Sequence, residues 1–273
     1  MIFPRLGFGC TGLATFALAL FAGAADAQDD PSLARLESSP RHQEWVEVPS
    51  AKGRKVRSFL VFPETDKPVP AVIIIHENRG LTDWVRSVAD QLAENGFVAI
   101  APDLLSGTGR DGGGTESFKP DMVTQGIYSL PAEQVTADLD AIAKYVRGLD
   151  ATNDKLAVAG FCWGGGKSFE YATHNGDLDA AFVFYGSAPD EAELKNVKVP
   201  VYGFYGGNDF RITGQVPKVT EALKSAGKSF EPVTYDAAGH GFMRAGEAAD
   251  AEPANKKAMQ EGWERWIAIL RKL

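Results

Sequence analysis

The stretch at residues 156–168, LAVAGFCWGGGKS, constrains the fold of this chain more than any other. An apolar run with the length of a buried strand is followed at once by Gly160, Cys162 and Gly164, and residues 169–174 have the pattern of a helix. A Gly-x-Cys-x-Gly pattern between a strand and a helix is typical of a nucleophile elbow, a sharp turn that strains its central residue. The stretch therefore predicts that the Cys162 sulfur stands above a sheet edge, beside helix amides that favour a thiolate.

Two later segments carry the partners that such a nucleophile needs. Residues 199–205 have the pattern of a strand and lead into a turn with Asp209, and residues 230–235 are the next strand candidate, followed by a Gly-His-Gly turn at His240. In a triad the histidine takes the proton of the nucleophile, and the carboxylate fixes the histidine tautomer. Taken singly, Asp209 could be a turn former and His240 a loop residue. Together, in this order and at strand ends, they predict a triad with Cys162.

The rest of the chain alternates between strand and helix patterns. The expected elements are an edge hairpin over 45–62, a buried strand over 71–75, a helix over 82–94, a strand over 97–101, a helix over 131–147 and a C-terminal helix over 255–273. This order predicts an α/β fold, with a mostly parallel, doubly wound sheet and helices on both faces in a single domain. Ligands of such folds bind at the carboxyl ends of the strands, where the candidate site residues lie.

The segments GFCWGG, YGGND, GHGFMR and HENRGL resemble the dienelactone hydrolase (carboxymethylenebutenolidase) family of α/β-hydrolases, from about residue 45 to the C-terminus. The resemblance implies the α/β-hydrolase fold and a hydrolase acting on carboxylic ester bonds. It implies that Cys162 is the nucleophile, with Asp209 and His240 as triad partners. It further implies that Glu77 holds the resting thiol and accepts its proton when substrate arrives, and that Arg244 binds a substrate carboxylate in a two-pronged contact.

The loop after the strand at 71–75 is where α/β-hydrolases place part of the oxyanion hole. Acyl transfer needs amides that point at the developing oxyanion, and the expected pair is the backbone N–H of Trp163 and that of Asn78. Glu77 lies in the same loop, and its carboxylate would oppose thiolate formation by like-charge repulsion.

Other interpretations of these residues stay open at this point. Glu77 could form a surface ion pair with Arg79 or Arg86, and Arg244 could be a solvated loop residue. Cys162 could be a small buried hydrophobic residue in a Gly-rich turn. His76 is given no role, because a histidine at a strand end is usually a packing or hydrogen-bonding residue.

The chain departs from the family between residues 104 and 130. This Gly-rich segment has only Arg110 and Lys119 as cations and no match to a second carboxylate-binding arginine of the family, which leaves open whether dienelactone is cleaved. A loop of this kind could form a lid, with Tyr128 lining the pocket.

Residues 1–27 are expected to be a secretory signal peptide. An apolar stretch precedes Ala25-Asp26-Ala27, a small-residue cleavage site, and it is short, interrupted by glycine and followed by no basic stop, unlike a membrane anchor. We therefore expect an exported protein, periplasmic or secreted after cleavage near Ala27, with one domain over 28–273 and a loosely held arm over 28–42. Because Cys10 lies in the signal, the mature chain would keep a single thiol and no internal disulfide.

Net charge and residue spacing exclude several classes of binding partner and cofactor. The net charge of −8 argues against nucleic acid or an anionic membrane surface, and no segment after the signal is long and apolar enough to span a bilayer. The four histidines show no metal-ligand spacing, and the glycine run at 164–166 lacks the dinucleotide fingerprint, so neither metal nor cofactor is expected. The oligomeric state is left open.

The hypothesis from sequence is a dienelactone-hydrolase-like cysteine hydrolase that cleaves a small ester or lactone through an acyl-enzyme on Cys162. An anionic substrate would need a local basic group. The alternatives are an esterase or thioesterase of broad range, and a non-catalytic binding or thiol-sensor protein on the same fold.

Overall fold

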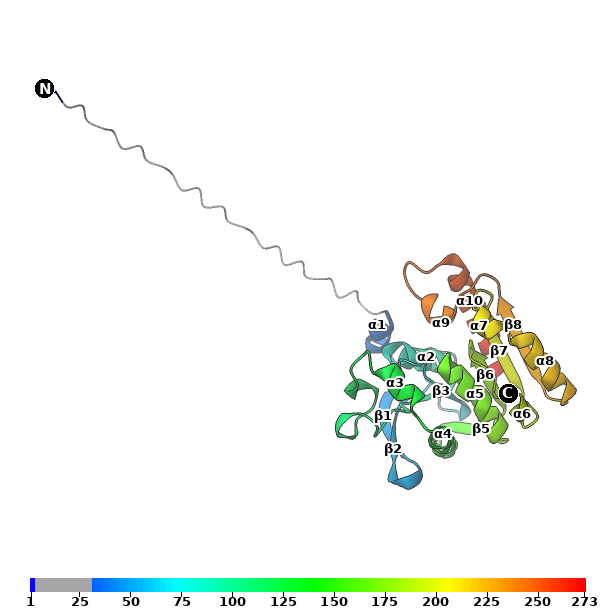
Figure 1. Ribbon diagram of the computed structural model, residues 1–273. Helices are drawn as coiled ribbons and strands as arrows, with labels where there is room; N and C mark the ends of the chain where they lie inside the picture. The colour runs from blue at the N-terminus through cyan, green and yellow to red at the C-terminus, as the bar shows by residue number, and fades with distance from the viewer. Residues whose placement is uncertain (3–30) are drawn as a thin grey trace.

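The computed structural model describes residues 1–2 and 31–273, which form one eight-stranded sheet with helices on both faces (Figure 1). The strands are β1 (Gln43–Pro49), β2 (Lys55–Val61), β3 (Val69–Ile75), β4 (Val98–Pro102), β5 (Thr152–Phe161), β6 (Ala180–Phe184), β7 (Val201–Gly206) and β8 (Phe230–Tyr235). The helices are α1 (Pro31–Ser38), α2 (Asp83–Glu94), α3 (Val123–Tyr128), α4 (Ala132–Arg147), α5 (Trp163–His174), α6 (Glu191–Leu194), α7 (Phe210–Thr213), α8 (Val216–Ser225), α9 (Phe242–Ala245) and α10 (Pro253–Leu270). The predicted signal peptide at 1–27 lies, apart from its first two residues, outside the described residues and stays a prediction.

The sheet has the order β1-β2-β4-β3-β5-β6-β7-β8, and its strands from β4 to β8 run parallel. The hairpin of β1 and β2 lies at one edge and pairs antiparallel with β4, which confirms the predicted edge hairpin. Sequence patterns missed only one strand, the short apolar β6 between β5 and β7. Because β5, β7 and β8 are parallel and close in the sheet, their carboxyl ends meet at one edge, and the candidate residues follow these ends.

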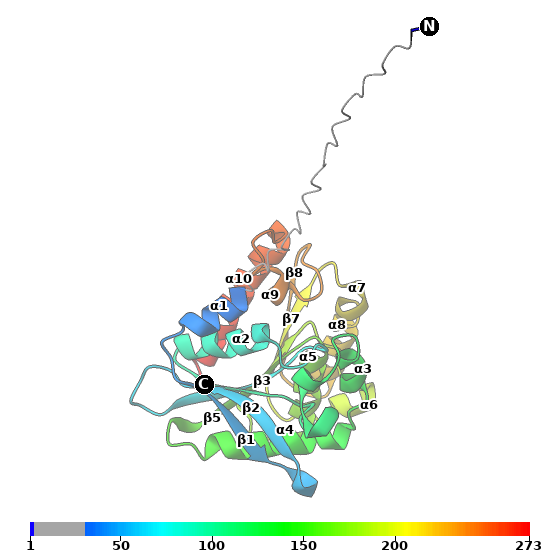
Figure 2. The ribbon, with the colours of Figure 1, turned by 90° about the vertical axis from the view of Figure 1, so that its left-hand side faces the viewer.

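Helices cover both faces of the sheet and enclose two apolar cores. Helices α1, α2 and α10 pack on one face, and α4, α5 and α8 on the other (Figure 2). The apolar stripe of α10 is buried as expected, since Trp266 is fully buried and Leu270 is 1% exposed. The predicted α/β-hydrolase architecture is thus confirmed. Among the described residues, no helix combines the length and apolar character needed to cross a membrane.

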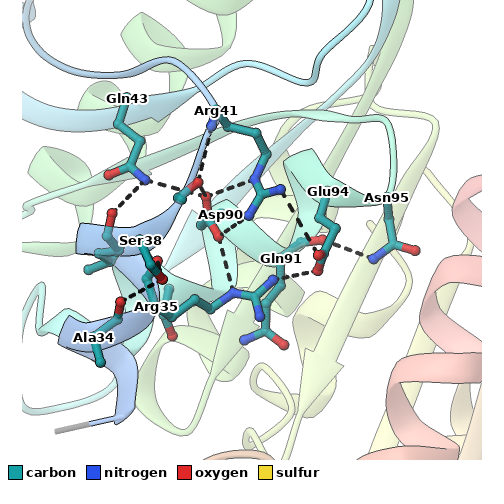
Figure 3. A network of polar contacts seen from close by, with 12 residues as sticks. Ala34, Arg35, Ser38, Arg41, Gln43, Asp90, Gln91, Glu94 and Asn95 are labelled. Carbon is teal, nitrogen blue, oxygen red and sulfur yellow. Dashed lines mark hydrogen bonds and ion pairs between the residues drawn. The ribbon is translucent and has the colours of Figure 1, made fainter. Parts of the chain in front are cut away.

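From residue 31 on, the N-terminal arm packs on the domain, contrary to the expectation that residues 28–42 are loosely held. Helix α1 lies along α2, and the Asp90 carboxylate, which has no exposed side-chain surface, joins the two (Figure 3). The Arg41 guanidinium donates to it from Nε at 2.9 Å and from Nη2 at 2.7 Å, while Arg35 Nε donates at 3.1 Å and Ser39 Oγ at 2.5 Å. This arm is therefore anchored to the domain by a buried charge network.

Asp90 also shows why the sequence could not reveal the anchor. Burial alone would raise the pKa of this carboxyl, but the hydrogen bonds from Arg41 and Ser39 outweigh it, so the pKa is lowered. The carboxylate thus stays charged at neutral pH. Its partners lie about fifty residues earlier in the chain; Arg41, for example, precedes it by 49 residues. A pattern confined to one helix cannot indicate partners so far away.

Candidate active site

The predicted elbow is present at the junction of β5 and α5. Cys162 is the N-cap of α5 and has φ 55° and ψ −114°. Non-glycine residues rarely adopt a positive φ. Its N–H donates to the Phe184 carbonyl of β6 at 3.0 Å, and its own carbonyl accepts from the Gly166 N–H at 3.2 Å. These bonds hold the strained residue in place at the helix N-terminus.

The glycines around Cys162 are required by close backbone contacts. A Cβ on Gly160 would lie 1.9 Å from the Gly164 carbonyl oxygen, and a Cβ on Gly164 would lie 2.4 Å from the carbonyl oxygens of both Ile75 and His76. The first turn of α5 therefore lies directly against the end of β3 as well as the end of β5. This contact brings the loop after β3 beside Cys162.

The two expected partners converge on Cys162. The Asp209 carboxylate, from the turn after β7, accepts a hydrogen bond of 2.5 Å from His240 Nδ1. The two turns that carry them are joined directly, since the Asn208 N–H donates to the Ala238 carbonyl at 2.9 Å. Because Nδ1 carries the proton in this bond, Nε2 is the ring atom left for the nucleophile, as the triad mechanism requires.

The Cys162 side chain affects the protonation of the His240 imidazole. Hydrogen bonding with Cys162 raises the pKa of His240 to about 9; burial opposes this rise, and Asp209 adds to it. A histidine that gains charge stabilisation from its neighbours is protonated at neutral pH. The imidazole is therefore suited to hold a proton while the sulfur attacks.

Glu77 is buried, at 4% exposure, and forms an ion pair with Arg244, whose Nε donates to Oε2 at 2.9 Å. The alternative surface pair with Arg79 or Arg86 is not formed, and Arg86 contacts Asp83 instead. A buried carboxylate next to a nucleophile is costly without a cation, and Arg244 supplies that cation. In this structure the Arg244 guanidinium is thus paired with Glu77.

Tyr185, directly after β6, is a site residue that the sequence analysis missed. It is fully buried and has φ 40°; its ring lies edge-on to His240 with 5.1 Å between centroids, and its hydroxyl donates to Glu77 Oε1 at 3.5 Å. Burial, followed by the Glu77 charge, raises the pKa of its hydroxyl well above the usual value, which keeps it a donor. In the sequence, its position directly after the apolar run at 180–184 was the only available signal.

The two predicted oxyanion donors lie on either side of the contact between α5 and the end of β3. Within residues 31–273, neither the Trp163 N–H nor the Asn78 N–H donates to a protein group. Both residues are partly exposed. Unpaired amides at a helix N-terminus and its adjoining loop are what a developing oxyanion requires.

A pocket of about 320 Å³ opens over Cys162 and His240. Its apolar wall comes from α3 and the following turn, with Tyr128 at the rim, so the expectation that Tyr128 lines the pocket is confirmed. Its charged residues are Lys167, Glu170 and Arg211. Lys167 Nζ is paired with Glu170 at 2.6 Å, whereas Arg211 has no ion-pair partner in the part of the chain that the structure describes.

Arg244 does not line this pocket. It lines a second, larger pocket of about 970 Å³, together with Arg79, Trp84 and the start of α1. Its side chain is 40% exposed, so the guanidinium N–H groups not used by Glu77 face that space. Among the described residues, no group of three His, Cys, Asp or Glu side chains could hold a metal ion.

Comparison with known proteins identifies the family of this chain. Residues 56–273 match the model of the dienelactone hydrolase family. The chain is 31% identical over 258 residues to the "Putative carboxymethylenebutenolidase" of Yersinia pestis, covering 89% of this chain and 93% of that one. It is 30% identical over 255 residues to a protein of the same name from Saccharolobus solfataricus, covering 81% and 95%.

A solved structure gives the same result. The crystal structure of the "Putative Dienelactone Hydrolase" of Klebsiella pneumoniae superposes with a TM-score of 0.75 at 29% identity, covering 85% of this chain and 99% of that one. Family model, relatives and solved structure thus agree over most of the chain. The chain belongs to the dienelactone hydrolase family of α/β-hydrolases and is a hydrolase acting on carboxylic ester bonds.

Proposed function

We propose that this protein cleaves a small ester or lactone through an acyl-enzyme on Cys162. The observation that carries the proposal is the convergence of three segments. They supply the strained cysteine at the elbow, the His240 ring whose pKa is raised chiefly by its hydrogen bond with Cys162, and the Asp209 carboxylate 2.5 Å from that ring. A buried structural cysteine would not need a positive φ or an imidazole beside it.

The chemistry follows from these positions. The Cys162 sulfur attacks the carbonyl carbon as the thiolate, its proton being the one that His240 holds, and forms a C–S bond. The charge that develops on the carbonyl oxygen is held by the amides of Trp163 and Asn78. The C–O bond then breaks, and the leaving oxygen takes the proton held by His240. Water, deprotonated by the same ring, attacks the thioester and releases the acid and the thiol.

Glu77 is proposed to control the thiol before substrate arrives. Its buried carboxylate disfavours a second negative charge at Cys162, and the Arg244 pair offsets part of that effect. If Arg244 moved toward a substrate carboxylate, the Glu77 charge would lose its compensating cation. Arg244 is therefore proposed as a substrate contact only for molecules that reach the second pocket.

Intact-mass spectrometry tests the acyl-enzyme directly. After brief mixing with p-nitrophenyl acetate and acid quenching, we expect one acetyl group on the protein, located on the peptide that contains Cys162. The same measurement with cis-dienelactone separates a lactonase from an esterase of broad range. A protein that is oxidised at Cys162 by peroxide but never acylated by either compound would instead be the non-catalytic thiol sensor.

Arg211 supports a preference for anionic substrates. It lines the catalytic pocket and carries a charge without an ion-pair partner among the described residues, unlike Lys167, whose charge is offset by Glu170. An acidic protein with a net charge of −8 repels anions in general, so a local cation at the pocket has a large influence on their binding.

We expect Arg211→Gln to raise KM for mono-p-nitrophenyl succinate about fivefold, the effect of one partly exposed charge pair, and to leave KM for neutral p-nitrophenyl acetate unchanged. Steady-state kinetics with both esters measures the difference. Lys224→Gln on α8 removes an equal charge from an exposed position outside the pocket and serves as the control. Equal KM changes for both esters would contradict the role of Arg211.

A further inference from the structure

His76 is a buried titratable residue that the mechanism above does not use. It follows β3, has no exposed surface and precedes Glu77 and Asn78 in the loop beside the elbow. Its ring is stacked on the Trp163 ring, with 5.5 Å between centroids and an angle of 12°. The side chain therefore contacts both segments that carry the proposed oxyanion donors.

The backbone partners of His76 define its tautomer. Nδ1 lies 2.8 Å from the Glu77 carbonyl oxygen, which can only accept, so Nδ1 carries the proton. Nε2 lies 3.3 Å from the Leu104 N–H, which can only donate, so Nε2 is unprotonated. The imidazole is thus neutral. Burial lowers the pKa of His76, against the charges of Asp103 and Glu77 that face it, and keeps it in this state.

The bond to Glu77 fixes the direction of one oxyanion donor. The Glu77 carbonyl and the Asn78 N–H belong to the same planar trans peptide and point in opposite directions. A hydrogen bond that holds the carbonyl oxygen toward His76 therefore holds the Asn78 N–H away from His76. The Gly80 N–H also donates to this carbonyl, at 3.2 Å, so the His76 bond is the shorter of two that hold the peptide plane. The Asn78 N–H has no partner of its own within residues 31–273.

We propose that His76 is a positioning residue for the oxyanion hole, acting through the Glu77–Asn78 peptide. This inference rests on the proposed acyl transfer at Cys162. The Trp163 N–H is oriented by helix α5, whereas the Asn78 N–H lies in a loop peptide whose carbonyl bonds the His76 side chain. Preorganised donors of this kind give the largest single contribution to many acyl transfers.

Two amide variants separate the two ring nitrogens. In His76→Asn the amide nitrogen can take the place of Nδ1 and keep the bond to Glu77, but the acceptor for Leu104 is lost. In His76→Gln the amide oxygen can take the place of Nε2 and accept from Leu104, but the donor to Glu77 is lost. Each variant removes one of the two bonds and both remove the ring stacking, so they serve as controls for each other.

We expect His76→Gln to slow acylation by p-nitrophenyl acetate, measured in single-turnover experiments, about 10-fold to 100-fold, since removal of one oxyanion donor costs about 100-fold or more. We expect His76→Asn to stay within about threefold of the wild type, and KM to change little in either. Alkylation of Cys162 by iodoacetamide should be unchanged in both, because displacement at a saturated carbon forms no oxyanion.

Three results would overturn the inference: acylation by His76→Gln at the wild-type rate, a greater loss in His76→Asn, or a parallel loss of alkylation. If His76→Gln fails to fold in a thermal unfolding assay, His76→Asn decides alone, since retained acylation supports the role and a tenfold loss refutes it. Wild-type protein that forms no acyl adduct would contradict the proposed function itself, whatever the variants do.

Discussion

Cys162→Ala is expected to lower kcat for p-nitrophenyl acetate by about 10,000-fold or more, because members of a triad act as a unit and little remains when the nucleophile is lost. The fold should be retained. Cys162 is partly exposed and an N-cap without a side-chain capping bond, so its sulfur makes a small contribution to stability. Steady-state hydrolysis and thermal unfolding of the variant measure the two effects separately.

Ser187→Ala is the matched control for this substitution. Ser187 lines the same pocket and carries the other small nucleophilic side chain among its lining residues. We expect this variant to stay within about twofold of the wild type, because Ser187 has no imidazole positioned to take its proton. The opposite pattern, with activity in Cys162→Ala and loss in Ser187→Ala, would move the nucleophile to Ser187 and refute the proposed mechanism.

Gly160→Ala is expected to destabilise the protein by about 3 kcal/mol or more, the upper range for overpacked positions. The added Cβ would lie 1.9 Å from the Gly164 carbonyl oxygen and 2.9 Å from the Gly165 nitrogen. Both are backbone atoms, so no side-chain rotation can relieve the contact. The turn that presents Cys162 would have to open, and activity should be lost with stability.

Gly148→Ala provides the comparison, since the nearest atoms to its added Cβ are 3.4 Å and 3.6 Å away, an ordinary contact. Its φ of −85° also suits alanine. We expect its free energy of unfolding, measured by urea denaturation, to change by less than about 1 kcal/mol. Equal stability of Gly160→Ala and Gly148→Ala would show that the elbow is less tightly packed than the contacts indicate.

Local patterns were sufficient wherever one segment carried the whole signal. The elbow at 156–168 shows its strand, its turn and its helix in consecutive residues, and the strands before Asp209 and His240 end where their apolar runs end. The fully apolar β3 is typical of a strand buried on both faces. Such features depend on backbone sterics and on the spacing of apolar residues, and both can be inferred from consecutive residues of the sequence.

Contacts between distant segments were a different matter. Glu77 and Arg244 lie 167 residues apart, and the charge of either alone is compatible with a surface position. The anchored arm was predicted to be loose, because α1 has few apolar residues and its buried partner Asp90 lies on another helix. The bonds of His76 to the Glu77 and Leu104 backbone could not be inferred from a histidine at a strand end.

The sequence by itself determined the order of Cys162, Asp209 and His240 along the chain and the strands that precede them, because strand periodicity and glycine turns are local properties. Only the tertiary structure decided which charges meet, which amides of the described residues lack a partner and which backbone groups bond the His76 ring. Those outcomes depend on the relative placement of β3, β5, β6 and α9 to within an ångström, and hydrogen bonds and ion pairs fall off over that distance.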